Sequence, residues 1–142
     1  MKEKKPVPGI CLGAQLIASA HGAPETKYLA ETGWCPIKTV HNAFPALPRV
    51  FHAFQLHEGT FGIPPGGALL CTGERVQNQA LLYGSAVGLQ FHVDLTRELI
   101  QLWTRHMPGK ERAMITRDSD RYLAESNRIC EGIIRAFTYG FQ

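Results

Sequence analysis

The tight turn around Cys11 constrains the fold of this chain more than any other part of its sequence. Glycine lies two residues before and two residues after this cysteine, at Gly9 and Gly13. A short apolar stretch (residues 6–10) precedes the turn, and residues 12–20 are small or apolar residues of good helical propensity. We therefore expect a strand, a sharp turn and a helix, the arrangement of a nucleophile elbow.

Such a turn would make Cys11 chemically reactive. Flanking side chains must be small for the chain to turn so sharply, and the cysteine is then held in open space. The N-terminus of the helix that begins at Leu12 would stabilise a thiolate and then an oxyanion. The pattern predicts a cysteine nucleophile, although it also fits a small buried thiol that only packs.

A second reactive feature follows the apolar run at residues 86–91. His92 ends this run, and Asp94 lies two residues later. Residues two apart in an extended chain point to the same side, so Asp94 can hold one ring nitrogen while the other faces the thiol. Alternatively, His92 is a surface residue or a hydrogen-bonded core residue without a catalytic role. Because ligands bind at the carboxyl ends of strands in open α/β sheets, we predict a triad: Cys11 as nucleophile, His92 as general base and Asp94 as the orienting group.

The rest of the chain predicts a β-rich middle followed by two helices. Glycines and prolines separate short apolar runs typical of strands, at residues 28–30, 33–40, 50–56, 68–72, 79–83 and 86–91. Thr96 is a suitable N-cap for a helix over residues 97–106, which Met107, Pro108 and Gly109 would end. A final amphipathic helix is expected from about residue 118 to about residue 137.

Length and composition argue against several classes of protein. The 142 residues, 44% apolar and 19% charged, are typical of one globular domain, here residues 1–142. The net charge of +3 is small and the basic residues are scattered, so nucleic acid is not an expected partner. No signal-peptide core or membrane-length apolar run is present, so no membrane is expected. Four widely spaced cysteines without a CxxC pair indicate a cytoplasmic protein without structural zinc.

Three stretches resemble the motifs of a known family, the class I (triad) glutamine amidotransferases. The likeness is greatest to stand-alone members similar to the glutaminase domain of GMP synthase. Residues 6–18 (PVPGICLGAQLIA) resemble the nucleophile motif, residues 55–64 (QLHEGTFGIP) an internal histidine-containing segment, and residues 88–94 (GLQFHVD) the closing histidine motif. Their order and spacing also agree with the family.

The resemblance implies an α/β fold, the flavodoxin-like three-layer amidotransferase domain, and a defined reaction. The thiolate would attack the side-chain amide of glutamine, ammonia would leave, and water would release glutamate from a thioester, with His92 moving the proton. The backbone N–H of Leu12 would be an oxyanion donor, and Gln15, Gly13 and His57 would complete the substrate-binding residues. No cofactor and no metal are expected, and the ammonia would pass to a synthetase partner.

The sequence departs from the family pattern in two places. The family usually has Pro-Glu after its histidine, where this chain has Val93 and Asp94, so the carboxylate is one methylene shorter. The family's first strands, and the glycine loop that donates the second oxyanion hydrogen bond, have no counterpart in the ten residues before Cys11. We therefore expect a domain incomplete at its N-terminal side, whose uncovered sheet edge pairs with a second copy in a homodimer.

Two other functions fit the same residues. A γ-glutamyl hydrolase of the same superfamily would use the same triad, and a catalytically inert binding subunit would keep the turn without a complete oxyanion hole. His52, His57 and Glu58 could be mistaken for a metal site, but no third ligand has suitable spacing, and the resemblance places this segment in a loop near the pocket. The remaining cysteines and both tryptophans are expected to pack: Cys35, Cys71, Cys130, Trp34 and Trp103.

Overall fold

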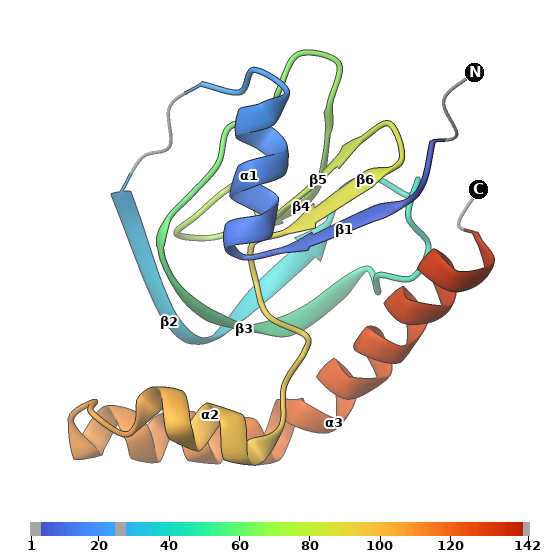
Figure 1. The fold of residues 1–142 in the computed structure, drawn as a ribbon. Helices are drawn as coiled ribbons and strands as arrows, with labels where there is room; N and C mark the ends of the chain where they lie inside the picture. Colours follow the sequence, from blue (N-terminus) through green and yellow to red (C-terminus); the bar gives the residue numbers. More distant parts are fainter. Residues whose placement is uncertain (1–3, 25–27, 141–142) are drawn as a thin grey trace.

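The computed structural model describes residues 4–24 and 28–140, in which one curled sheet carries helices on both faces (Figure 1). The elements in chain order are β1 (Val7–Ile10), α1 (Leu12–Ala20), β2 (Tyr28–Thr39), β3 (Val50–Gly59), β4 (Ala68–Gly73), β5 (Ala80–Tyr83), β6 (Ala86–Leu89), α2 (Arg97–Thr104) and α3 (Gly109–Tyr139). The expected strand, turn and helix at the start of the chain are confirmed.

The sheet is mixed, with the strand order β1-β6-β5-β4-β2-β3. β1 and β6 pair in parallel, with Val7 opposite Ala86 and Ile10 opposite Leu89, whereas the other named strand pairs are antiparallel. Parallel neighbours end at the same edge of a sheet. The residues that follow β1 and β6, which include Cys11 and His92, are therefore brought together.

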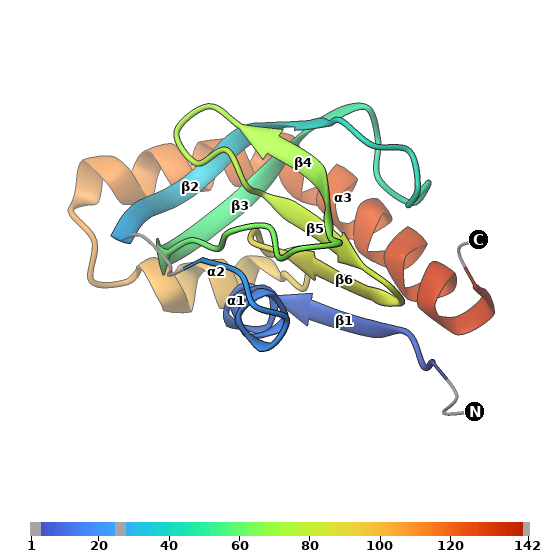
Figure 2. The same cartoon turned by 90° about the horizontal axis from the view of Figure 1, so that it is seen from above.

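Alternation along the central strands separates the two faces of the sheet. Leu81 of β5 packs with α1, and Gly88 of β6 lies against the same helix. Val87 and Leu89, the neighbours of Gly88, point to the opposite face and pack in the cluster that contains Ile129 of α3. Figure 2 shows α1 and α3 on opposite sides of the strands. This three-layer arrangement confirms the predicted α/β fold.

The middle of the chain forms longer strands than the sequence predicts. β2 runs without a break through both of the short runs expected there, with a register shift between Tyr28 and Glu31 against β3. Gly33, the first residue of the second run, is accommodated inside the strand at a φ of 93°. Glycine permits this left-handed conformation without strain, so the chain can bend here without ending the strand.

The two C-terminal helices differ in how well they were predicted. Thr96 caps α2 as expected, because its side chain accepts from the backbone N–H of Leu99 at 3.1 Å. The predicted start of the last helix near residue 118 is wrong, since α3 begins directly after Pro108. Over residues 109–117 the helix buries only Ile115, so its first turns have no apolar stripe that a pattern could reveal. Further along the buried face, the Ser119 hydroxyl accepts from Trp34 Nε1 at 3.0 Å. Within the described residues, no helix has both the length and the apolar character to cross a membrane.

Candidate active site

Cys11 lies in the turn between β1 and α1, with a backbone conformation that is rare for residues other than glycine. Its φ is 54° and its ψ is −107°, and its N–H donates to Leu89 O of β6 at 2.7 Å. Gly9 is required for space, because a Cβ there would lie 2.6 Å from the backbone carbon of Gly13. At Gly13 itself a Cβ would meet none of the described atoms within 4 Å. Only the first of the two glycines is thus needed to avoid a clash.

The first residues of α1 are arranged to stabilise negative charge beside Cys11. The amides of Ala14 and Gln15 donate to the Cys11 carbonyl at 3.1 and 3.3 Å, so the helix begins immediately after the turn. Leu12 and Gly13 are its first two residues, and N–H groups at this position have no carbonyl partner inside a helix. The N-terminus of a helix favours an anion, which suits a thiolate or an oxyanion.

His92 is held by contacts on several sides at the end of β6. Its backbone N–H donates to Phe54 O of β3 at 2.9 Å, and its ring packs edge-on to Trp103 with centroids 4.9 Å apart. Nδ1 lies 3.1 Å from Asp94 Oδ1. The shorter carboxylate therefore still reaches the ring.

The ring of His92 also interacts with the Cys11 thiol, and this changes its ionisation. Burial lowers the pKa of His92, but hydrogen bonds and charges from Asp94 and Cys11 outweigh burial and raise it from 6.5 to about 9. The hydrogen bond to His92 lowers the pKa of Asp94. At neutral pH His92 is consequently an imidazolium between a carboxylate and the sulfur.

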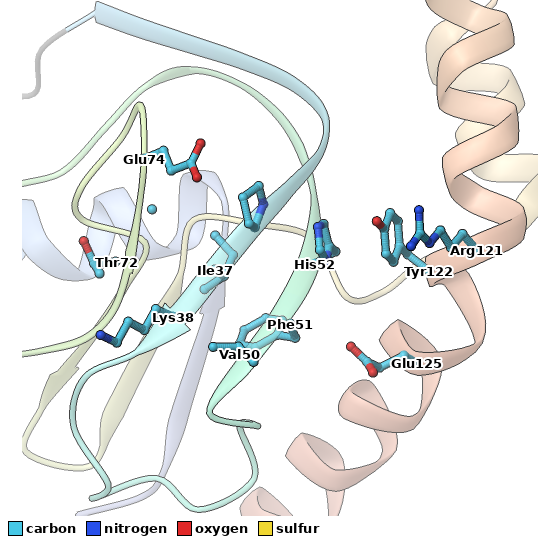
Figure 3. Close-up of a pocket in the computed structure, with 12 residues that line it drawn as sticks. Ile37, Lys38, Val50, Phe51, His52, Thr72, Glu74, Arg121, Tyr122 and Glu125 are labelled. Atoms are coloured by element: carbon cyan, nitrogen blue, oxygen red, sulfur yellow. The ribbon is translucent and has the colours of Figure 1, made fainter.

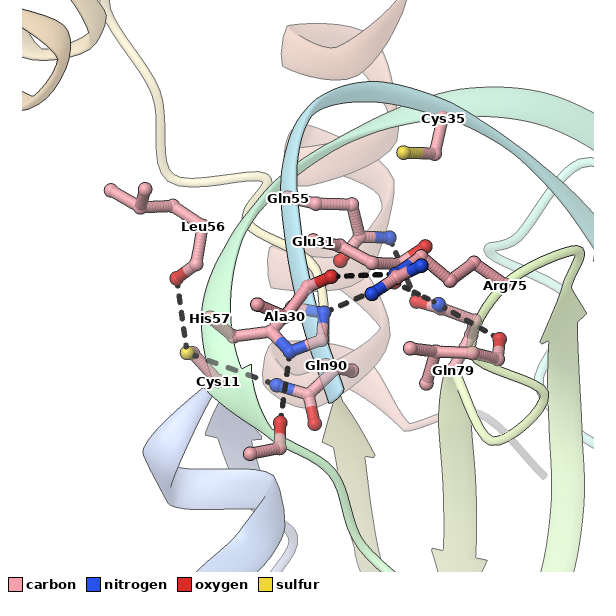
Figure 4. Close-up of polar contacts among 12 residues, drawn as sticks. Cys11, Ala30, Glu31, Cys35, Gln55, Leu56, His57, Arg75, Gln79 and Gln90 are labelled. Carbon is pink, nitrogen blue, oxygen red and sulfur yellow. Dashed lines mark hydrogen bonds and ion pairs between the residues drawn. The ribbon is translucent and has the colours of Figure 1, made fainter. Parts of the chain in front are cut away.

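Two further groups contact the Cys11 sulfur (Figure 4). Sγ lies 3.8 Å from Leu56 O of β3 and 3.8 Å from Gln90 Nε2. The predicted substrate-binding residue Gln15 lies beside them, because its Nε2 donates to Gln90 Oε1 at 3.4 Å and to Gly59 O at 3.1 Å. The turn, the start of α1 and the end of β3 therefore converge on one point.

His57 lies within β3 and not in a loop, so that part of the prediction is wrong. Its side chain is only 1% exposed, with Nε2 3.1 Å from Glu31 Oε1 and Nδ1 2.8 Å from Gly59 O. This burial keeps the ring away from open solvent. His57 therefore reaches the site through Gly59, which also accepts from Gln15.

The other three thiols are less suited to react than Cys11. Burial raises the pKa of Cys35 and of Cys71 to about 11, with the charge of Glu31 adding to the effect on Cys35. Burial also raises the pKa of Cys130. Cys71 is fully buried in the core and Cys130 packs against it, as expected for packing residues.

A separate cavity of about 620 Å³ lies between α3 and strands β2, β3 and β4 (Figure 3). His52 lines it, with its ring stacked on Tyr122 at a centroid distance of 4.0 Å. His52 therefore does not join His57 in one site. In the described part of the chain, no group of three or more His, Cys, Asp or Glu side chains could hold a metal ion.

The family model of the class-I glutamine amidotransferases matches residues 1–99. This chain belongs to that family. A search of curated proteins found no match. Among solved structures, this chain resembles a glutamine amidotransferase from Thermotoga maritima, with 26% identity over 95% of this chain and a TM-score of 0.84. A glutamine amidotransferase from Methylobacillus flagellatus has 28% identity over 96% of the chain and a TM-score of 0.81.

A third structure, of a putative GMP synthase subunit from Thermoplasma acidophilum, shares the fold at 22% identity. The match covers 82% of this chain and 59% of the Thermoplasma chain, with a TM-score of 0.59. The present chain spans 63% and 64% of the length of the Thermotoga and Methylobacillus structures.

Sequence reasoning missed Glu31 and Gln90, which the structure places near the site. Gln90 stands two residues before His92, inside the closing histidine motif, so its position was a usable signal. Glu31 carries no such signal. It meets His57 because β2 and β3 pair in antiparallel with these two residues opposite each other, a long-range register that local patterns do not reveal.

Proposed function

We propose that this chain hydrolyses the side-chain amide of glutamine through a cysteine thioester and releases ammonia. The observation that carries the proposal is the placement of Cys11 in a left-handed turn at a helix N-terminus, interacting with a histidine that a carboxylate holds at 3.1 Å. Cys11, His92 and Asp94 are the proposed triad, and Leu12, Gly13, Gln15 and His57 are the proposed substrate-binding residues.

The proposed reaction begins from a thiolate beside an imidazolium. Sulfur attacks the amide carbon, and the negative oxygen that forms accepts a hydrogen bond from the Leu12 N–H. When the carbon–nitrogen bond breaks, His92 gives its proton to the leaving nitrogen, which departs as ammonia. Neutral His92 then removes a proton from water, hydroxide attacks the thioester, and glutamate leaves as the thiolate and imidazolium are restored. The raised pKa of His92 suits the first proton transfer.

The proposed partners follow from the product. Ammonia is useful to a synthetase that accepts it, and one related fold is that of a putative GMP synthase subunit. We infer a cytoplasmic location from four free thiols, and association of two copies through the exposed edge of the sheet. No cofactor is required for this chemistry.

Replacing Cys11 by alanine tests the proposal. Wild-type protein should release ammonia from glutamine and should be labelled once by a diazoketone analogue of glutamine, whereas Cys11→Ala should lose both, with a rate fall of about a thousandfold or more. Ammonia release is followed by a coupled assay and labelling by mass spectrometry. Cys130→Ala is the matched control and should keep both. Wild-type protein that neither reacts with the analogue nor releases ammonia would instead indicate an inert binding subunit, and release from γ-glutamyl peptides alone would indicate the hydrolase.

A further inference from the structure

A continuous path of hydrogen bonds joins the Cys11 sulfur to a buried carboxylate that the reaction above does not use. Figure 4 shows the contact of Cys11 with Gln90 at one end of the path and His57 with Glu31 at the other. The path ends at Glu31, whose side chain is 4% exposed. Its members in order are Cys11, Gln90, Gln15, the Gly59 carbonyl, His57 and Glu31. A carboxylate this deeply buried requires partners, because an unpaired buried charge is strongly destabilising.

Each ring nitrogen of His57 faces an oxygen atom within hydrogen-bond distance. Nδ1 faces the Gly59 carbonyl at 2.8 Å, and a carbonyl oxygen can only accept. Nε2 faces Glu31 Oε1 at 3.1 Å, and the same oxygen accepts from Gln79 Nε2 at 2.9 Å. The Gln79 amide is fixed in this orientation, since its nitrogen also donates to Val76 O at 3.1 Å. His57 and Glu31 thus form a buried, hydrogen-bonded pair.

We propose that Glu31 is a positioning residue for glutamine: by holding His57 as a double donor, it fixes the Gly59 carbonyl and through it the Gln15 carboxamide. Gly59 O accepts from both His57 and Gln15, so it connects the end of β3 to α1. Because Gln15 uses its nitrogen in these contacts, its oxygen is the atom that it offers to a ligand. This inference rests on the proposed function, since it names what orients the substrate at the same site.

An amide cannot replace the carboxylate of Glu31. Both His57 Nε2 and Gln79 Nε2 converge on one oxygen, Oε1. In Glu31→Gln, an amide oxygen at this place could accept from Gln79. A neutral His57 that keeps its proton on Nδ1 would then have no hydrogen-bond donor for its Nε2. An amide nitrogen there would meet the Gln79 nitrogen. Either orientation leaves a buried polar group unpaired, so the position of the ring is no longer fixed.

Charged and titratable groups from the surrounding elements also face Glu31. Cys35 on β2 interacts with it, and Glu74 and Arg75 line the same small cavity from the turn after β4. Arg75 is exposed and donates through Nε to the Ala30 carbonyl at 2.8 Å. His57 is in direct contact with Glu31 through the hydrogen bond given above.

Steady-state kinetics of Glu31→Gln test this role. We expect the KM for glutamine to rise about tenfold or more while kcat changes less than about threefold, because substrate orientation is lost and the triad is untouched. Glu74→Gln removes an exposed carboxylate from the same cavity and is the matched control, with both constants unchanged. An unchanged KM in Glu31→Gln would overturn the proposal. A loss of activity that appears only as a lower kcat would overturn it as well.

Nitrogen NMR of the His57 ring supplies a second test on the wild-type protein. Both ring nitrogens should carry protons at pH 7, and a bare ring nitrogen would overturn the proposal even if Glu31→Gln fails to fold. A wild-type protein that releases no ammonia, yet shows the doubly protonated ring, would contradict the proposed function and leave the pair standing. In that case the rate of Cys11 alkylation tests the positioning role. Glu31→Gln should lower the rate of alkylation by the diazoketone analogue of glutamine about tenfold, and should leave the rate of alkylation by iodoacetamide unchanged.

Discussion

Three of the four thiols of this chain lie in surroundings that oppose ionisation. Burial raises the pKa of Cys35, Cys71 and Cys130, carboxylates add to the effect on Cys35 and Cys130, and Cys71 lies in the apolar core. Cys11 instead lies at a helix N-terminus and beside His92, whose pKa is about 9. The distinction among four chemically identical side chains therefore comes from one cation and one helix end.

The raised pKa of His92 predicts an alkaline limit to activity. If the imidazolium donates the proton to ammonia, kcat/KM should fall as pH rises through about 9. Asp94→Asn removes a hydrogen bond and a charge that raise this pKa, so the fall should begin at least about one pH unit lower. A pH–rate profile of both proteins measures this. If kcat/KM falls over the same alkaline pH range in both proteins, Asp94 does not control the pKa of His92.

The ionisation of His92 also makes the stability of the folded chain depend on pH. The pKa of His92 is 6.5 in ordinary surroundings and about 9 in the folded chain. Its contribution to stability is therefore fully present below about pH 6.5 and is lost as pH rises through about 9. The depressed pKa of Asp94 acts oppositely: its contribution is present above the ordinary value of 3.8 and is lost in acid.

The junction of β1 and α1 depends on how closely the helix approaches the strand. A Cβ at Gly9 would lie 2.6 Å from both the Gly13 backbone and the Ile17 side chain. Gly9→Ala should destabilise the chain by about 1–3 kcal/mol, a fall in Tm of roughly 3–10 °C. Differential scanning calorimetry measures the change.

Gly13→Ala is the matched control for this substitution. A Cβ at Gly13 meets none of the described atoms within 4 Å, and alanine has the better helical propensity. The Tm should stay the same or rise slightly. Equal losses of Tm in the two variants would mean that the close approach of α1 to β1 is not what requires glycine.

The elements that were predicted from sequence are those with local causes. The strand, turn and helix around Cys11 and the Thr96 cap depend on neighbouring residues, as does the contact between His92 and Asp94, two residues apart. The start of α3 was missed because residues 109–117 bury only Ile115 and so show no apolar stripe. Glu31 was missed because its partner, His57, lies 26 residues away on another strand. Pairing across a sheet is not encoded in any short window.

The sheet as a whole has an exposed edge at β1, next to the candidate site (Figure 2). Val7 on this strand is 47% exposed, and Leu12 and Leu16 on the adjacent helix are 63% and 60% exposed. Unpaired backbone groups beside solvent-exposed apolar side chains favour association with another chain. The longer structures to which this chain is similar contain additional polypeptide beyond the part it matches.

A second copy covering this edge should give a particle of twice the 15.7 kDa mass of one chain in multi-angle light scattering. Leu16→Glu should shift the population to monomer, because a charge on the contact surface would be desolvated on association. Leu102→Glu is the matched control: Leu102 is 52% exposed but lies on α2, and this variant should stay dimeric.

A wild-type monomer throughout the micromolar range would show that the β1 edge is stable in water by itself. Its four-residue length, with Pro6 directly before it and Pro8 within it, would then be sufficient to prevent pairing.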